Sequence, residues 1–155
     1  KELYGNQIVM GQTHNPIKVS IRQFYGIEIN DFAVSVARTA LWIAESKMMK
    51  ETEDIINMNL DFFPLTNYAN IVEGNALRLN WEDIVPKNEL NYIMGNPPFV
   101  GHQYRNKSQI DDMLSVFGSS GYKKLDYVCS WFKKSADYIE DKAIHVAFVS
   151  TNSIT

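Results

Sequence analysis

The chain has 155 residues, of which 45% are hydrophobic and 21% are charged, and its formal net charge at pH 7 is −3. This composition predicts one soluble globular domain with its own core and excludes a disordered chain. This negative net charge is not typical of a domain that binds nucleic acid by itself, which carries an excess of basic residues. No apolar run could span a membrane, and no secretory leader pattern is present, so the default location is the cytoplasm.

Residues that could build a metal or disulfide centre are sparse. Cys129 is the only cysteine, which excludes an intrachain disulfide and a thiolate cluster. His14, His102 and His145 are scattered without the spacing of metal ligands. The sequence therefore predicts a protein that works without a metal.

The first regular elements form half of a βαβ unit. Phe24–Ile29 is typical of a strand that ends in an acidic residue, Asn30 and Asp31 supply a helix cap, and Phe32–Lys50 is periodic. At the end of such a strand, Glu28 either accepts hydrogen bonds from the ribose of a nucleotide or is simply solvated. One apolar stripe is expected to be buried: Ala33, Ala37, Ala40, Leu41, Ala44 and Met48.

A second strand and turn follow a stretch without a clear pattern. Glu51–Asn70 is left unassigned, and Lys1–Met10 only weakly suggests the end of a helix. Asn70–Leu77 predicts a short strand that leads into a turn. Asn75 in this turn can both donate and accept hydrogen bonds, which suits either a ligand ring or its own turn.

The most informative stretch is Gly95–Phe99. Leu90–Met94 predicts a buried strand before it, and two consecutive prolines then force the chain out of the sheet in a stiff loop. The loop offers the side-chain oxygen of Asn96, the carbonyl of Pro97 and the ring of Phe99. Two acceptors and an aromatic face suit a planar molecule with an exocyclic amino group.

Three further elements are predicted after this loop. Asn106–Phe117 has the pattern of a helix, and the helical pattern resumes at Leu125, with Asp126 in its first turn. Ala143–Val149 has the pattern of a strand. The sequence therefore predicts an α/β fold.

The tetrapeptide Asn96-Pro97-Pro98-Phe99 resembles the catalytic motif of amino-directed methyltransferases that use S-adenosylmethionine. Three further segments are similar to the corresponding parts of N6-adenine DNA methyltransferases. They are Phe24 to Met48, the Leu125–Val128 run with Trp131, and the last strand with its polar turn. The similarity is closest to the methylase portion of single-chain type IIG restriction–modification enzymes. It extends from about Phe24 to Thr155.

The resemblance implies a Rossmann-like sheet of order 3-2-1-4-5, with strands 2 to 5 present and strand 1 missing. The glycine-rich cofactor loop of the family is absent, so residues 1–155 are expected to be a partial catalytic domain without a target-recognition domain. Strands two and four should then pair directly, swap with a partner, or need the missing neighbour. The fragment could also self-associate through exposed sheet edges.

For the intact enzyme, the resemblance implies methylation of adenine N6 in double-stranded DNA with S-adenosylmethionine as cofactor. The implied catalytic residues are Asn96, Pro97, Pro98 and Phe99, and the implied cofactor-binding residues are Glu28, Ile29, Asn75, Ala76 and Asn96. Two alternatives stay open: an amino methyltransferase acting on protein glutamine or RNA guanine, and a non-catalytic scaffold.

Overall fold

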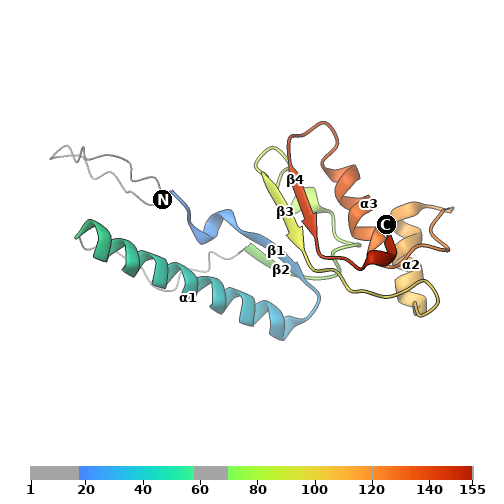
Figure 1. Cartoon of the computed structure of the whole chain (residues 1–155), viewed down its shortest axis with the longest axis horizontal. Helices are drawn as coiled ribbons and strands as arrows, with labels where there is room; N and C mark the ends of the chain where they lie inside the picture. The colour runs from blue at the N-terminus through green and yellow to red at the C-terminus, as the bar shows by residue number, and fades with distance from the viewer. Residues whose placement is uncertain (1–17, 58–69, 120, 155) are drawn as a thin grey trace.

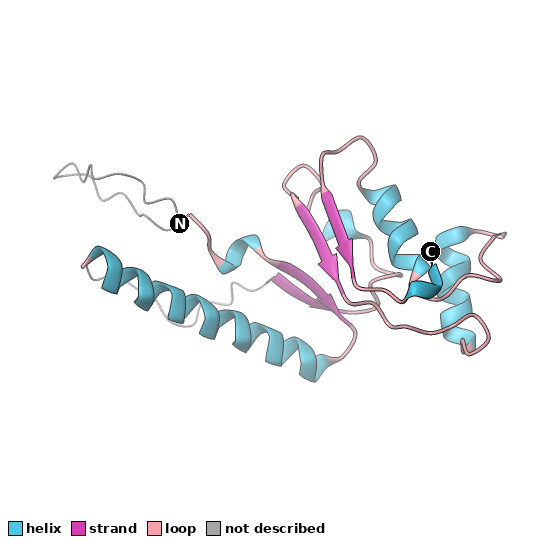
Figure 2. Ribbon diagram, viewed as in Figure 1, coloured by secondary structure: helices cyan, strands magenta, loops and turns pink. Residues whose placement is uncertain are grey.

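The computed structural model describes residues 18–57, 70–119 and 121–154, which form a mixed α/β arrangement (Figures 1 and 2). The prediction for Lys1–Met10, and most of the unassigned stretch before Asn70, lie outside the described residues. The elements in chain order are β1 (Tyr25–Glu28), α1 (Asp31–Ile56), β2 (Asn70–Glu73), β3 (Tyr92–Gly95), α2 (Lys107–Phe117), α3 (Cys129–Tyr138) and β4 (His145–Phe148).

The four described strands form two parallel pairs. β1 pairs with β2 from Tyr25↔Asn70 to Glu28↔Glu73, and β3 pairs with β4 from Tyr92↔His145 to Gly95↔Phe148. No described strand joins the two pairs, so direct pairing of the expected strands two and four, which are β1 and β3, is wrong. In Figure 1 the strand arrows of both pairs run toward the same side of the molecule.

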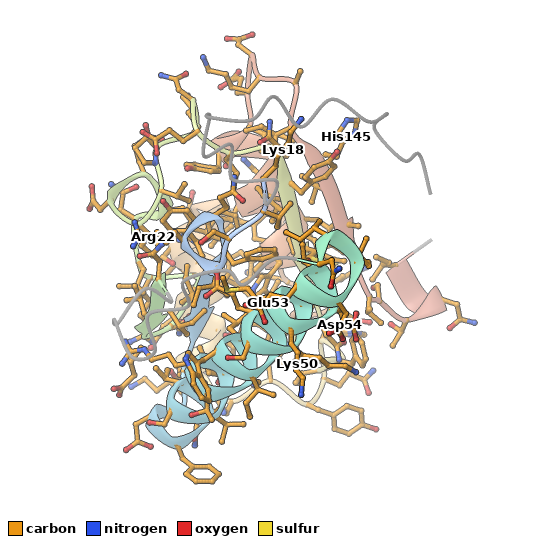
Figure 3. The ribbon with its side chains drawn as sticks, turned by 90° about the vertical axis from the view of Figure 1, so that its left-hand side faces the viewer. Lys18, Arg22, Lys50, Glu53, Asp54 and His145 are labelled. Atoms are coloured by element: carbon orange, nitrogen blue, oxygen red, sulfur yellow. The ribbon has the colours of Figure 1, made fainter. Side chains whose placement is uncertain are left out.

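The helix α1 begins where the sequence predicts, because the Asn30 side chain accepts a hydrogen bond from Ala33 N at 2.9 Å. The expected buried stripe is wrong: Ala40, Ala44 and Met48 are exposed, and Val34 is the buried residue of α1. A helix of 26 residues runs for about 39 Å, whereas four-residue strands run for only about 13 Å. The two-stranded sheet is therefore too short to cover the helix, and α1 extends past the ends of β1 and β2 (Figure 1). Lys50, Glu53 and Asp54 are labelled on its last turns in Figure 3.

The strand β3 is also less buried than its apolar sequence suggests. Tyr92 and Met94 are 65% and 78% exposed, so the prediction of a buried strand is wrong. Only one face of this sheet is covered by a described element, where Phe132 of α3 meets Phe148 of β4 edge to face, with ring centroids 5.2 Å apart. On the other face Tyr92 stacks on His145, with centroids 5.6 Å apart.

The helix α3 begins at Cys129 rather than at Leu125, so Asp126 does not lie in its first turn. The backbone before the helix instead binds a distant segment, because Tyr127 N donates to the carbonyl of Val100 at 2.8 Å. That bond crosses to the segment after β3 and fixes the approach to the helix. By contrast, α2 follows the prediction closely, with Asn106 as its cap.

The main core lies between α2, α3 and the segment that follows β2. Leu77, Met113 and Tyr127 are its buried members. Further partly buried side chains pack around them: Val100, Val116, Phe117, Tyr122, Leu125 and Trp131. The core therefore packs the segment after β2 against the loop after β3. These two segments carry the candidate site.

Candidate active site

The loop after β3 presents the three groups that the sequence singled out. The strand ends at Gly95, and the Asn96 side chain that follows is exposed. Phe99 is 48% exposed, whereas Pro97 is buried and Pro98 exposed. Within the described part of the chain, the Asn96 amide and the Pro97 carbonyl have no hydrogen-bond partner. The Asn96 amide oxygen and the Phe99 ring are therefore exposed to a ligand, and the carbonyl of the buried Pro97 has no competing partner among the described residues.

The segment after this tetrapeptide, residues 100–102, is fixed by the residues that precede α3. Val100 O accepts from Tyr127 N, and His102 N donates to Asp126 Oδ1 at 2.9 Å. Arg105 fastens the next bend, because its guanidinium donates to the carbonyls of His102 and Lys123 at 3.0 and 2.7 Å. The guanidinium of Arg105 is thus engaged by backbone oxygens. The residues from 96 to 102 are called the Asn96 loop below.

The residues at the carboxyl end of β1 are partly or fully exposed. Glu28 is half-buried, and its Oε1 accepts from Asn30 N at 3.1 Å. The carbonyl of Glu28 accepts from Gly74 N at 2.8 Å, so the ends of β1 and β2 are tied together. Ile29 is 69% exposed. The second carboxylate oxygen of Glu28 has no protein partner among the described residues and can accept from a ligand hydroxyl.

The turn after β2, residues 75–79, is called the Asn75 turn. Asn75 Oδ1 accepts from Leu77 N at 2.9 Å, and Asn75 O accepts from the backbone of Arg78 and Leu79. The side chain therefore stabilises its own turn, which is one of the two interpretations that the sequence left open. Ala76 is half-buried, and within the described part of the chain its N–H has no hydrogen-bond partner.

A buried carboxylate, Asp112 of α2, lies behind this turn and is only 2% exposed. Its Oδ2 accepts from Asn75 Nδ2 at 2.9 Å and from the Tyr127 hydroxyl at 2.7 Å, while its Oδ1 accepts from Arg78 Nε at 2.5 Å. Burial raises the pKa of Asp112, but hydrogen bonds from Tyr127, Arg78 and Asn75 outweigh this effect and hold the pKa below its ordinary value. Asp112 is therefore a charged group at neutral pH.

The Asn75 turn is held from a second side by Lys134 of α3. Its ammonium donates to the carbonyls of Leu77 and Leu79 at 2.8 and 2.6 Å, and it lies 5.5 Å from the centroid of the Trp81 ring. Burial lowers the pKa of Lys134. Sequence reasoning missed Lys134 and Asp112, because a single charge within a helical pattern is ordinarily taken for a solvated residue.

Comparison with known proteins finds a matching family model and two similar proteins. The chain matches the family model "MmeI, DNA-methyltransferase domain" over residues 3–155. It is 41% identical over 153 residues to DNA methyltransferase A of Bacillus subtilis strain 168, which covers 96% of this chain and 17% of that protein. It also resembles the type IIL restriction–modification enzyme MmeI, solved in complex with DNA, with a TM-score of 0.83 and 38% identity over 89% of this chain.

The chain therefore belongs to the MmeI DNA-methyltransferase domain family. The predicted similarity to the methyltransferases of restriction–modification enzymes is confirmed. The chain spans less than a fifth of the length of either relative, namely 17% and 19%. Among the described residues, no group of three or more His, Cys, Asp or Glu side chains could hold a metal ion. None of the described helices is long and apolar enough to cross a bilayer.

Proposed function

We propose that this chain carries the base-binding part of a DNA methyltransferase that modifies the N6 amino group of adenine within a restriction–modification system. The observation that carries the proposal is the Asn96 loop, in which the Asn96 amide and the Phe99 ring are exposed and the carbonyl of the buried Pro97 has no partner among the described residues. Family membership supports DNA as the substrate. Because that substrate would be cellular DNA, the activity is placed in the cytoplasm.

The target amino group is engaged in base pairing within a duplex, so the adenine must be extruded before it can react. The exposed face of Phe99 is suited to stack on the extruded base, worth about 1–3 kcal/mol. Asn96 Oδ1 and Pro97 O then accept the two amino hydrogens. These bonds would draw the nitrogen toward tetrahedral geometry and free its lone pair for attack on the sulfonium methyl group of the donor. As the nitrogen–carbon bond forms, the carbon–sulfur bond would break and the sulfur would leave with the bonding pair as a neutral thioether. The methylated nitrogen would then lose one proton to solvent.

The residues at the ends of β1 and β2 fit S-adenosylmethionine as the methyl donor. Glu28 offers a carboxylate oxygen to ribose hydroxyls, and Ile29 supplies an exposed apolar surface next to it. The N–H of Ala76 is available to donate to a ring nitrogen, and Asn75 retains one amide hydrogen for the same ligand. When bound, the cofactor supplies an electrophilic methyl group, so these residues need only bind and orient it.

The experiment uses the protein at its full natural length with S-adenosylmethionine labelled in the methyl group. Label should enter DNA, and Asn96→Ala should abolish incorporation even at saturating cofactor, with cofactor binding by the unsubstituted protein measured by calorimetry. Incorporation into RNA or into protein glutamine instead of DNA would establish the alternative amino methyltransferases. A protein that binds no cofactor and labels none of these would be the scaffold, and the proposal would be wrong.

A further inference from the structure

The Asn75 turn follows the pair formed by β1 and β2, and the Asn96 loop follows strand β3 of the other pair. Among the described strands, no strand pairing joins one pair to the other. In the part of the chain that the structure describes, side-chain and loop contacts rather than strand pairing connect the two segments.

The Asp112–Tyr127 hydrogen bond forms the direct bridge between them. Asp112 binds Asn75 and Arg78 on one side, while the hydroxyl of Tyr127 reaches the same carboxylate. The backbone of Tyr127 binds Val100, the residue next to Phe99, at 2.8 Å. Asp112 and Tyr127 are both buried, with Tyr127 only 5% exposed. The path from Asn75 to the Asn96 loop thus passes through two buried side chains.

The bridge is built from groups that resist rearrangement. An unpaired buried carboxylate is strongly unfavourable, so Asp112 needs its donors in place. Burial, and then the bond to Asp112, raise the pKa of Tyr127 above its ordinary value, so its hydroxyl keeps its proton and remains a donor. Neither partner can turn to solvent without leaving the other unsatisfied.

We propose that Asp112 and Tyr127 are positioning residues that hold the Asn75 turn and the Asn96 loop at the spacing that methyl transfer requires. This inference rests on the proposed function, in which the turn holds the cofactor and the loop holds the base. Methyl transfer joins one atom from each side in line. A displacement of about 1 Å at such a junction can lower the rate by about a hundredfold even when both ligands still bind.

The test is Tyr127→Phe in the full-length natural protein, with Tyr138→Phe as a matched control. Tyr138 also donates its hydroxyl to a protein acceptor, the carbonyl of Val85, but that bond does not reach the Asn96 loop. Single-turnover methyl transfer would be measured with labelled S-adenosylmethionine and a duplex carrying the protein's own modified site. The affinities for cofactor and for duplex would be measured separately.

Tyr127→Phe should lower the single-turnover rate by about tenfold or more, a smaller loss than that of a full 1 Å displacement, while both affinities stay within about twofold. Asp112→Asn, which keeps the size of the side chain, should lower the rate in the same way. Tyr138→Phe should leave the rate unchanged. Equal rates for Tyr127→Phe and Tyr138→Phe would overturn the inference while leaving the proposed function intact. Absence of transfer by the unsubstituted protein would refute the proposed function and this inference together.

Discussion

Replacing Lys134 with methionine should lower the local stability of the Asn75 turn, because the ammonium group stabilises the turn in addition to Asp112. Methionine keeps most of the apolar stem but removes the two donors that reach Leu77 O at 2.8 Å and Leu79 O at 2.6 Å. Each charge-assisted bond is worth about 1.5–3 kcal/mol. Burial of the ammonium, which lowers the pKa of Lys134, offsets part of that gain.

The net loss should therefore be about 2–3 kcal/mol of local stability, which corresponds to an opening equilibrium about 30- to 150-fold larger. The amides of Arg78 and Leu79 report this opening, because both donate to Asn75 O, at 2.9 and 3.0 Å. Hydrogen exchange followed by mass spectrometry on the full-length natural protein resolves the peptide that contains them.

The neighbouring residue provides a matched control. Lys133 pairs with Asp137 one turn along α3, and both side chains are exposed. An exposed pair of this kind contributes about 0–1 kcal/mol, so Lys133→Met should leave exchange in the Asn75 turn unchanged. If Lys134→Met also exchanged within about twofold of the unsubstituted protein, far less than the change expected from two lost charge-assisted bonds, the two-sided fastening of the turn would be refuted.

The site and its supports lead to three further predictions. Phe99→Ala should weaken use of the DNA substrate by about 10- to 100-fold in kcat/KM, whereas Phe99→Tyr should retain most of it; equal losses would exclude stacking. Asn30→Ala removes the bond to Ala33 N and should cost about 1 kcal/mol of stability in the first turn of α1, visible as faster exchange there; unchanged protection would show that the cap contributes nothing. The pKa of Tyr127 is raised by burial and by its bond to Asp112, so its contribution to stability is full below a pH of about 10 and falls as the pH rises further toward the folded pKa. The melting temperature should therefore fall less steeply with pH for Tyr127→Phe than for the unsubstituted protein between about pH 9 and 11.5, a range around the ordinary tyrosine value. Equal slopes for the two proteins would contradict the bond between Tyr127 and Asp112.

The sequence predicted the features that depend on local chemistry. Asn30 was predicted as a helix cap because its side chain can satisfy a free N–H group of the first turn, a property of a few neighbouring residues. The strand before the tetrapeptide ends at Gly95 because prolines cannot continue a ladder. These features needed no knowledge of the rest of the chain.

The features that depend on distant partners could not be predicted in this way. Met94 is exposed because nothing in the described part of the chain covers its face of the sheet. The helix α3 begins at Cys129 because Tyr127 N binds Val100, a residue far earlier in the chain. Asp112 looks like any exposed acid in a helix until the Asn75 turn is placed against it. Each outcome depends on whether a distant segment packs there, and hydrophobic periodicity does not record this.

The most direct test of the central claim identifies the methylated atom. DNA incubated with the full-length natural protein and labelled S-adenosylmethionine would be digested to nucleosides and separated by mass spectrometry. We expect label in N6-methyladenine with the unsubstituted protein and none with Asn96→Ala. Label in methylated cytosine, or N6-methyladenine that persists in Asn96→Ala, would contradict N6 methylation by the Asn96 loop.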